Sequence, residues 1–592
     1  MCGISGIINF NGMGIEGELI KSFGASLAHR GPDDSGEYIY TSQRLSLALI
    51  HRRLKIIDLS ERAHQPISNE DGSIQLIFNG EIYNYIELMQ QLVSLGHRFK
   101  SRSDSEVIVH AYEEWGADCL EKFVGMFAFA LWDSSSEVLF CARDRIGIKP
   151  FYYFYETGKS FIFASELKAF FNIGISWKVN LNALYSFLRI GYCLENQTWI
   201  KDIMHLAPGS FLLLRNNELT VKSYWDACDF HVKETSESDA CKKIRGLLNE
   251  SSRLCLRSDV KIGAYLSGGI DSSAVVSLMC SQGAVPESVF SGVFDAGKKY
   301  DERPFMDEMI SRFSLNSRRV RIGAEDFLGV MEKLSWCLDE PVVGPGAYSQ
   351  YRVCELIHND GFKVVLGGQG GDELFGGYAR YLRGAPQRPL PKGARKYFDN
   401  KRFRIKSAAG RVRNFIKRSL RLEAIKVNCQ LHPEILDSVD SNIIGHLDNM
   451  PVSLEGMLMW DLKHYLPALL QVEDRLGMAF SLETRFPLLD HRLVELSLSL
   501  PSYLKVNAFS LKYIFRQSIK DILPEKIYAR KDKMGFPTPF NEWIREKNIS
   551  SMLREEIRPF LRPYFSDLKT LSWEKSVIGL WLKLLKSKIK KP

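Results

Sequence analysis

The chain has 592 residues, of which 45% are hydrophobic and 25% are charged, and its formal net charge is +8. This composition is that of a globular protein of about two to four domains, and no apolar run approaches the roughly 20 residues that span a bilayer. Eleven cysteines without a CxxC pair argue against a disulfide framework or a zinc site. Together with the lack of a signal peptide they favour a cytoplasmic protein with reduced thiols.

The first residues, MCGISGI, place a thiol at Cys2. Removal of Met1 would give Cys2 a free α-amine, which titrates at about 7.7–8.0. One residue would then supply both a nucleophile and its base. A buried strand cysteine and an acylated anchor are the alternatives, but the anchor of a secreted lipoprotein needs an export segment before the cysteine.

Short β-rich runs separated by turn residues follow this start and predict packed antiparallel sheets. We expect these strands within residues 51–60, 73–85, 125–133, 137–145 and 160–170.

Polar clusters that punctuate these strands carry a second set of candidate residues. Asn79 can offer a side-chain amide N–H, and Gly80 an unobstructed backbone N–H, to an oxyanion. Arg53 can bind a carboxylate in bidentate fashion, and Glu81 and Asp104 can bind an ammonium group. Together these groups would recognise a free amino acid with an amide side chain, which is glutamine.

The segments that carry these residues resemble class II glutamine amidotransferase domains. MCGISGI, HRGPDDSG, HRRLKIIDLS, FNGEIYNY, SDSEVI, GMFAFALWD, ARDRIGIKPFYY and FASELKAF occur in that family's order and cover most of residues 1–170. The resemblance implies an α+β N-terminal-nucleophile fold, a four-layer αββα sandwich over residues 2–210. It implies that Cys2 attacks glutamine and releases ammonia and glutamate, assisted by Asn79 and Gly80. The glutamine-binding positions that it implies are Arg53, Leu54, Lys55, Ile56, Ile57, Asn79, Gly80, Glu81 and Asp104.

The pattern changes after a linker at about residues 205–240. VKIGAYLSGGIDSSAVVSLMC predicts a strand at 260–266, a glycine turn at 267–269 and a helix from about Asp271. Such a turn before a helix forms an anion cradle, although it lacks the GxxxxGK[ST] pattern of the Walker loop. A carboxylate at Asp271 would repel phosphate unless a cation lay between them, so we infer Mg²⁺ there. The alternative is an ordinary strand-to-helix turn with a Ser/Asp helix cap.

Two more apolar runs, at 287–294 and 363–378, alternate with helix-length segments. This alternation favours an α/β doubly wound parallel sheet, in which ligands bind beyond the carboxyl ends of the strands. The SGGIDSS and GGQGGDE loops would then share one crevice, with Asp372 as a second Mg²⁺ ligand.

The SGGIDSS loop resembles the pyrophosphate loop of ATP pyrophosphatases. Residues 235–570 resemble the synthetase domain of glutamine-hydrolysing asparagine synthetases through LSGGIDSS, YDERPF, DEP at 339–341, GDELFGGY, EDRLGMAFSLETRFPLLD at 473–490 and RKDKMGFPTPFNEW at 530–543. The resemblance implies that Lys533 stabilises charge during acyl transfer. It implies an ATP site at Leu266, Ser267, Gly268, Gly269, Asp271, Ser272, Ser273, Gly292, Gly367 and Gly368.

Several positions depart from that family's usual pattern. Gln369 replaces an acid that could act as a general base, and a glutamine cannot accept a proton. Val472 and Glu473 stand where a lysine is usual, Gly477 replaces the Ser of SMA, and Gly344 replaces an Asp after DEP. These departures leave amide formation as the expected reaction and put aspartate as its acceptor in doubt.

The positive charge is concentrated in one insertion of the second half. Residues 388–426 contain fourteen Lys or Arg and two acids, which leaves about −4 on the rest of the chain. We interpret this segment as a solvated, partly helical insertion, with contact to an anionic membrane surface or another acidic partner as the alternative. The charge therefore does not indicate a nucleic-acid-binding protein.

The two halves together predict a glutamine-dependent asparagine synthetase that uses ATP and Mg²⁺. The resemblance implies an ammonia tunnel between its domains, and a homodimer is a further expectation. Three alternatives stay open. The first is the same chemistry on another carboxylate, such as a sugar acid of a surface polysaccharide. The second is a non-catalytic protein that retains the fold, and the third is an enzyme that modifies tRNA, since SGG loops also occur there.

Overall fold

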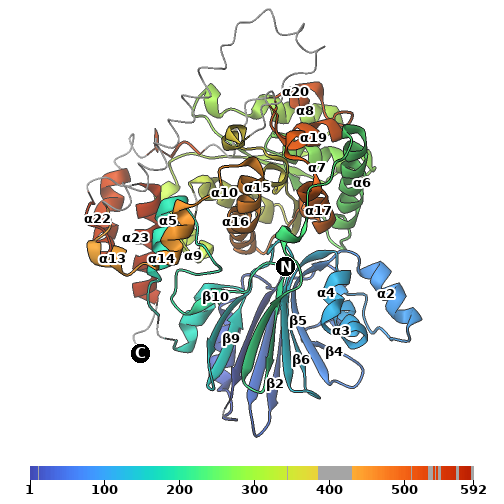
Figure 1. The fold of residues 1–592 in the computed structure, drawn as a ribbon, viewed down its shortest axis with the longest axis vertical. Coiled ribbons are helices and arrows are strands. Elements are labelled where there is room, and N and C mark those ends of the chain that lie inside the picture. Colours follow the sequence, from blue (N-terminus) through green and yellow to red (C-terminus); the bar gives the residue numbers. More distant parts are fainter. Residues whose placement is uncertain are drawn as a thin grey trace, which may run out of the picture.

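The chain forms two domains that meet near its N-terminus, which lies at the junction between them (Figure 1). The computed structural model describes residues 1–592 except for positions 11, 176, 343, 385–429, 508–509, 531–537, 541, 544–548, 569–571 and 589–592. The basic insertion at 388–426 lies wholly in the largest of these gaps, and Lys533 lies in another, so both expectations fall outside the described residues.

The first domain is built on two antiparallel six-stranded sheets, with orders β10-β8-β9-β1-β3-β2 and β12-β11-β7-β6-β5-β4. The strands are β1 (Gly3–Asn9), β2 (Asp34–Thr41), β3 (Ser46–Arg53), β4 (Ile67–Ser68), β5 (Ile74–Ile82), β6 (Gly125–Asp133), β7 (Val138–Arg143), β8 (Tyr152–Glu156), β9 (Ser160–Ala164), β10 (Ile203–His205), β11 (Ser210–Arg215) and β12 (Glu218–Ser223). The strand expected at 51–60 is the end of β3, because the chain leaves the sheet after Arg53 to form a loop.

The two sheets pack face to face through apolar side chains that alternate along the strands. Ile4 and Leu47 of the first sheet, for example, share one buried cluster with Ile77 and Trp132 of the second. Helix α1 (Gly17–Ala25) and a 3-10 segment at 167–173 cover the outer face of the first sheet. Helices α2 (Tyr85–Ser94), α3 (Asp104–Trp115) and α4 (Cys119–Lys122) cover the second (Figure 1). This arrangement confirms the αββα sandwich.

The second domain contains a five-stranded sheet of order β15-β14-β13-β16-β17, and every neighbouring pair in it is parallel. Its strands are β13 (Ile262–Tyr265), β14 (Val289–Val293), β15 (Ser317–Arg321), β16 (Val364–Leu366) and β17 (Glu483–Arg485). This confirms the α/β class predicted for this half.

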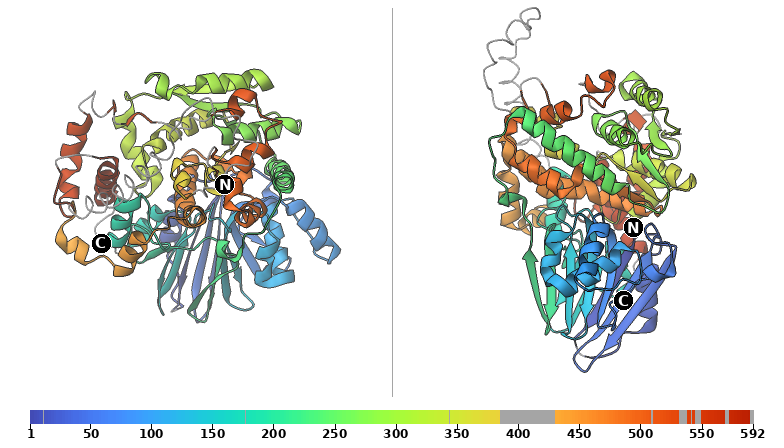
Figure 2. Two further views of the ribbon diagram at one scale, coloured as in Figure 1. Left: turned by 45° about the horizontal axis from the view of Figure 1, so that its top comes forward. Right: turned by 90° about the vertical axis from the view of Figure 1, so that its right-hand side faces the viewer.

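Helices cover both faces of the parallel sheet, because successive strand residues point to opposite sides. Leu366 joins the cluster with α6, α7, α17 and α19, whereas Val365 joins the cluster with α9, α10 and α16. The right-hand view in Figure 2 shows α6, in green, as a long helix lying above the first domain. The bounds are α6 (Glu237–Cys255), α7 (Ile270–Ser281), α9 (Phe327–Leu338), α10 (Gly346–Asn359), α16 (Leu466–Met478), α17 (His491–Ser499) and α19 (Tyr513–Ser518).

The C-terminal helices pack beside α5 (Leu181–Ile190) of the first half (Figure 1). Trp581 stacks edge-on against Trp199 at a centroid distance of 5.3 Å, so the two halves share a buried cluster. Across the described residues, no helix has both the length and the apolar character needed to cross a membrane. The remaining helices are α8 (Arg303–Phe313), α11 (Gly371–Phe375), α13 (Pro433–Asp437), α14 (Ser441–Asp448), α15 (Leu454–Trp460), α18 (Ser502–Lys505), α20 (Glu525–Tyr528), α22 (Ile549–Leu561) and α23 (Trp573–Lys588).

Candidate active sites

Cys2 lies directly before β1 and is buried at the domain junction. Its backbone N–H donates to Asn79 Oδ1 at 3.0 Å, and its carbonyl oxygen accepts from Arg30 Nε at 3.0 Å. Burial raises the pKa of the Cys2 thiol, against the opposing effects of the N-terminal charge and Arg53. A thiol with a raised pKa needs a nearby base to become the reactive thiolate, so the chemistry of this residue depends on what accepts its proton.

The residues expected to bind an oxyanion lie next to Cys2 on β5. Asn79 is fully buried, and its Nδ2 has no hydrogen-bond partner among the residues that the structure describes. A buried N–H without an acceptor is costly, and it is also what a site built for a transient anion requires. At Gly80 a Cβ would come within 2.1 Å of the Met126 carbonyl oxygen, so a residue without a side chain is needed there.

The charged groups expected to hold glutamine surround this pair. Asp104, at the start of α3, accepts from the Ile82 backbone N–H at 2.9 Å, and burial raises its pKa to about 6. Glu81 Oε1 lies 3.1 Å from Arg485 Nη2, a cation that comes from the second domain. Two buried carboxylates, Glu81 and Asp104, therefore lie near Cys2. The first domain contributes the cation Arg53 and the second domain the cation Arg485.

Arg53 differs from the expectation that its guanidinium is free to bind a carboxylate. Its Nη atoms donate to the carbonyl oxygens of Ser60 at 3.1 Å and Ile57 at 3.4 Å, and to that of Asp58. In this state Arg53 holds the loop that follows β3.

That loop, which contains four of the expected glutamine-binding positions, faces the second domain. Leu54, Ile56 and Ile57 are buried in a small cluster with Val364 of β16. Lys55 instead pairs with Glu61 at 2.7 Å at the edge of the loop. The loop therefore links the surroundings of Cys2 to the parallel sheet.

The SGGIDSS loop joins β13 to α7 and is organised by its own hydroxyl groups. Ser272 Oγ accepts from the Ser267 backbone N–H at 3.2 Å and lies 3.0 Å from Ser267 Oγ. Ser273 Oγ is buried and has no hydrogen-bond partner in the described part of the chain. A Cβ at Gly368 would come within 2.7 Å of the Ser272 backbone nitrogen. The loops after β13 and β16 therefore touch at one edge of the sheet.

Asp271 and Asp372, the two expected metal ligands, converge on one cation. The Lys512 ammonium contacts Asp271 and lies 2.7 Å from Asp372 Oδ1. Around them the packing is tight, since Cβ atoms at Gly371 and Gly377 would come within 2.4 and 1.6 Å of these carboxylate oxygens. Two carboxylates that converge in this way offer the hard oxygen ligands that fit Mg²⁺, and Lys512 offsets part of their mutual repulsion.

Cavities flank the SGGIDSS loop on two sides. One is lined by Leu266, Ser267 and Gly292 together with the aromatic rings of Phe290 and Phe294, which suits a flat ring. The other contains the cationic side chains Lys512, Arg516 and Arg530 beside Gly269, which suits phosphate groups. Gly367 lies between the loop and β17, where its Cβ would approach Thr484 to 3.1 Å.

The loop after β16 also carries Gln369, which contacts a carboxylate of α16. Glu473 is 5% exposed and is bonded by four neutral groups. Thr484 Oγ1 donates to its Oε1 at 3.1 Å, Gln350 Nε2 donates to its Oε2, and Gln369 and Tyr265 also bond to it. The glutamine that replaces an acid thus lies against another acid.

The other departures from the family pattern have separate places. Val472 is buried in the core beside α10, and Gly477 packs so closely that a Cβ would come 2.8 Å from the Leu482 carbonyl oxygen. Gly344 adopts φ +70° in open space.

Strand β17 and helix α16 of the second domain lie between the surroundings of Cys2 and the crevice that the SGGIDSS and GGQGGDE loops form. Arg30, which bonds to the Cys2 carbonyl, pairs with Asp474 of α16 through two bonds of 2.8 and 3.1 Å. The N-terminal ammonium of Met1 lies 3.2 Å from Glu483 Oε2 on β17. Residues next to these, Glu473 and Thr484, face the GGQGGDE loop.

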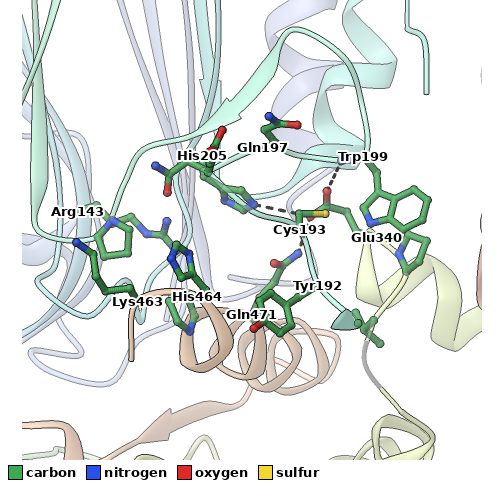
Figure 3. Close-up of a pocket in the computed structure, with 18 residues that line it drawn as sticks. Arg143, Tyr192, Cys193, Gln197, Trp199, His205, Glu340, Lys463, His464 and Gln471 are labelled. Atoms are coloured by element: carbon green, nitrogen blue, oxygen red, sulfur yellow. Dashed lines mark hydrogen bonds and ion pairs between the residues drawn. The ribbon is translucent and has the colours of Figure 1, made fainter. Parts of the chain in front are cut away.

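A further cavity, which the sequence did not predict as a site, lies between the domains (Figure 3). Trp199, Gln471 and His205 converge there on Glu340. Glu340 accepts from the Trp199 backbone N–H at 2.8 Å and from Gln471 Nε2 at 2.6 Å, and burial raises its pKa to about 7. The DEP motif at 339–341 is the sequence signal that could have indicated it.

Several charged residues of the sites were missed from the sequence. Arg30 lies within the quoted HRGPDDSG segment, and Glu483 and Arg485 within the quoted EDRLGMAFSLETRFPLLD segment, but none was given a role. Lys512 lies outside every quoted motif, so no local pattern pointed to it. It adopts φ +55° directly before α19.

Comparisons with known proteins agree with this geometry. Residues 243–565 match the family described as asparagine synthase, and residues 1–225 match the glutamine amidotransferase domain. Asparagine synthetase [glutamine-hydrolyzing] 1 of Bacillus subtilis (strain 168) is 30% identical over 589 residues, which covers 92% of this chain and 88% of that protein. Asparagine synthetase [glutamine-hydrolyzing] 3 of the same organism is 28% identical and covers 96% of each chain. Putative asparagine synthetase [glutamine-hydrolyzing] 2 of Methanocaldococcus jannaschii is 36% identical and covers 66% of this chain and 79% of that protein. The chain therefore belongs to the asparagine synthase family, with a glutamine amidotransferase domain at its N-terminal end.

Proposed function

We propose that the protein transfers ammonia from glutamine to a carboxylate that it first activates with ATP, and that aspartate is the acceptor. Glutamate, AMP, pyrophosphate and asparagine would be the products. The observation that carries this proposal is the pairing of two features in one molecule. One is a buried thiol beside an amide N–H that has no partner among the described residues, and the other is a glycine-rich loop beside two facing carboxylates. The first domain, which continues past the expected boundary at residue 210 through β11 and β12 to Ser223, would hydrolyse glutamine, and residues 235–570 would activate the acceptor.

In the glutamine half, removal of Met1 would convert the backbone nitrogen of Cys2 into an α-amine. That nitrogen lies 3.0 Å from Asn79 Oδ1, so the amide oxygen would orient the amine while the amine takes the thiol proton. Attack on the glutamine side-chain carbonyl creates an oxyanion, for which Asn79 Nδ2 and the Gly80 N–H are the donors. Asp104 and Glu81 would bind the substrate ammonium.

In the synthetase half, the SGGIDSS backbone and the cations Lys512, Arg516 and Arg530 would bind the phosphates of ATP. The acceptor carboxylate attacks the α-phosphate, which forms an acyl-adenylate and releases pyrophosphate. Asp271 and Asp372 would hold Mg²⁺, which neutralises phosphate charge when it is bound. We also propose Lys533 as a charge-stabilising residue of the acyl transfer.

The closeness of the two sites, which are separated by α16 and β17, supports a transfer of ammonia from one to the other within the chain. Ammonia is protonated in bulk water at neutral pH, and the protonated form does not attack an acyl group. A short protected path past α16 and β17 would deliver it as the free base.

A second acceptor class, a sugar acid, is favoured by one observation. Besides Gln369, the described side chains that bond to Glu473 are neutral hydrogen-bonding groups. They are those of Gln350, Thr484 and Tyr265. Such groups suit the hydroxyls of a uronic acid as well as an amino acid.

Exchange of labelled pyrophosphate into ATP separates the two acceptors, because it reports adenylate formation alone. We expect exchange with aspartate, and none with glucuronate or galacturonate. Exchange with a uronic acid but not with aspartate would show that a sugar acid, and not aspartate, is the acceptor. No exchange with any acid would contradict ATP-dependent activation, and glutamate release measured in parallel would show whether the glutamine half is active by itself.

A further inference from the structure

Amide formation by this protein requires a proton acceptor near the acyl-adenylate. Ammonia that attacks the acyl carbon becomes positively charged nitrogen in the tetrahedral intermediate, and this nitrogen must lose a proton before AMP leaves. The GGQGGDE loop offers Gln369 at this edge of the sheet, and an amide cannot accept that proton. The two acids of the same loop are already engaged, since Asp372 pairs with Lys512 and Glu373 accepts a hydrogen bond from the Tyr378 hydroxyl. A neighbouring element of the crevice can supply the acceptor instead.

Most described carboxylates around this edge are already neutralised by cations. Asp271 and Asp372 share Lys512, and Glu302 pairs with Arg530. On the side of the first domain, Asp474 pairs with Arg30 and Arg475, and Glu483 pairs with Arg485. A carboxylate that is held by a cation is a weak base, because the charged form is stabilised.

Glu473 differs from these carboxylates. All four of its bonding partners, Gln350, Gln369, Thr484 and Tyr265, are neutral, and no ion pair to it is found among the described residues. Burial raises its pKa, which moves a carboxylate toward the range in which a general base is effective at neutral pH.

The position of Glu473 relative to the ATP loop is also suitable. Tyr265, which bonds to Glu473, ends β13 and lines the same cavity as Leu266 and Ser267. Gln369, its other partner, follows Gly368, which touches Ser272. Glu473 thus lies between the loops after β13 and β16, on the side of the loops that faces the glutamine site.

We propose that Glu473 is the proton acceptor of the amide-forming step, and that it takes over on α16 the role that Gln369 cannot perform. The nitrogen of ammonia forms the bond to the acyl carbon, one proton moves from that nitrogen to a Glu473 carboxylate oxygen, and the bond from the acyl carbon to the AMP oxygen breaks. The amide and AMP leave, and Glu473 returns its proton to solvent. Gln350, Gln369 and Thr484 hold the carboxylate in place.

This role rests on the proposed function and makes a specific prediction for the two half-reactions. Glu473→Gln removes the base while it keeps the size of the side chain. Adenylate formation needs no proton transfer from nitrogen, so pyrophosphate exchange should stay close to that of the unmodified protein. Amide formation from ammonium chloride should fall about 10²–10⁴-fold, the usual contribution of a positioned base. Glu473→Asp, which retains a carboxylate, should recover part of this loss.

Replacing ammonia by a second nucleophile, hydroxylamine, tests whether Glu473 acts as a base or only supports the structure. Hydroxylamine is less basic than ammonia, so the nitrogen of its tetrahedral intermediate loses a proton to water more readily. Hydroxamate formation by Glu473→Gln should therefore fall much less than amide formation. The control is Glu355→Gln on α10, a carboxylate at the surface in an ion pair with Arg352, which should alter neither reaction.

The experiment uses the full chain and whichever acid supports exchange in the unmodified protein. Equal losses with ammonia and hydroxylamine, equal losses of exchange and amide formation, or no loss at all would each overturn the role of Glu473. Glutamine hydrolysis by the variant verifies that it is folded, and if Glu473→Gln fails this check, Glu473→Asp carries the same comparison. Absence of exchange in the unmodified protein would instead be a failure of the proposed function.

Discussion

Asn79→Ala should lower the turnover of glutamine without weakening its binding. In the free protein Asn79 Nδ2 has no partner among the described residues, so its N–H gains an acceptor when the oxyanion forms. An interaction that exists only in the transition state raises kcat and leaves KM unchanged. Loss of one such donor costs about 2.7–4 kcal/mol, or about 10²–10³ in kcat.

The Oδ1 atom of the same side chain has a separate role, and Asn79→Asp distinguishes the two. The carboxylate of this variant would keep an acceptor for the Cys2 nitrogen, which lies 3.0 Å from Oδ1, but would lack the N–H. If the donor matters most, Asn79→Asp should be at least as impaired as Asn79→Ala, because it also places a negative charge beside the oxyanion.

Release of glutamate from glutamine, measured over a range of glutamine concentrations, gives kcat and KM for each variant. Synthesis from ammonium chloride is the internal control and should be unaffected, since the synthetase site does not use Asn79. An Asn79→Asp variant that hydrolyses glutamine at more than about a tenth of the original kcat would refute the donor role.

Three other predictions test the division of labour. Cys2→Ala should abolish glutamine use and leave synthesis from ammonium salts, because the bonds to Asn79 and Arg30 use backbone atoms of Cys2; loss of the ammonia-driven reaction in product assays would contradict two separate sites. Asp271→Asn should stop pyrophosphate exchange and spare basal glutamate release, and a variant that still exchanges would exclude Asp271 as a metal and phosphate ligand. The pKa of Asp104 is raised to about 6, so Asp104 becomes uncharged as the pH falls through that value and can no longer pair with an ammonium. The KM for glutamine should therefore rise steeply below about pH 6, and a KM constant from about pH 7 to about pH 5 would show that Asp104 does not bind the ammonium group.

Local patterns in the sequence were sufficient for most of the fold. The short apolar run in residues 125–133 predicts a buried strand, and β6 spans the same residues. The turn before Asp271 predicts the start of a helix, and α7 begins at Ile270. In these segments a short apolar run and the placement of glycines indicate the element from local sequence alone. The strand expected at 51–60 holds only for its first three residues, which end β3. Leu54, Ile56 and Ile57 are instead buried beside Val364 of the other domain, a contact that no local pattern can indicate.

Contacts between distant segments could not be predicted in this way. Arg30 and Asp474 are separated by 444 positions and make two charged hydrogen bonds. Gln369 and Glu473 are each visible as departures from a family pattern, but the sequence does not show that they touch. Gln369 stands where the family usually has an acid, and Glu473 is an acid where the family usually has none. Because the two side chains are in contact, the crevice still contains a carboxylate.

The alternation of side chains on β17 ties the two active sites together. Glu483 and Arg485 point toward the glutamine site, where they contact the N-terminal ammonium and Glu81. Thr484, between them, points the other way and holds Glu473. Because successive strand residues must face opposite sides, β17 cannot shift by one position without reversing both sets of contacts. The same strand that contacts Glu81 beside Cys2 thus also holds, through Thr484, the carboxylate that we assign to amide formation.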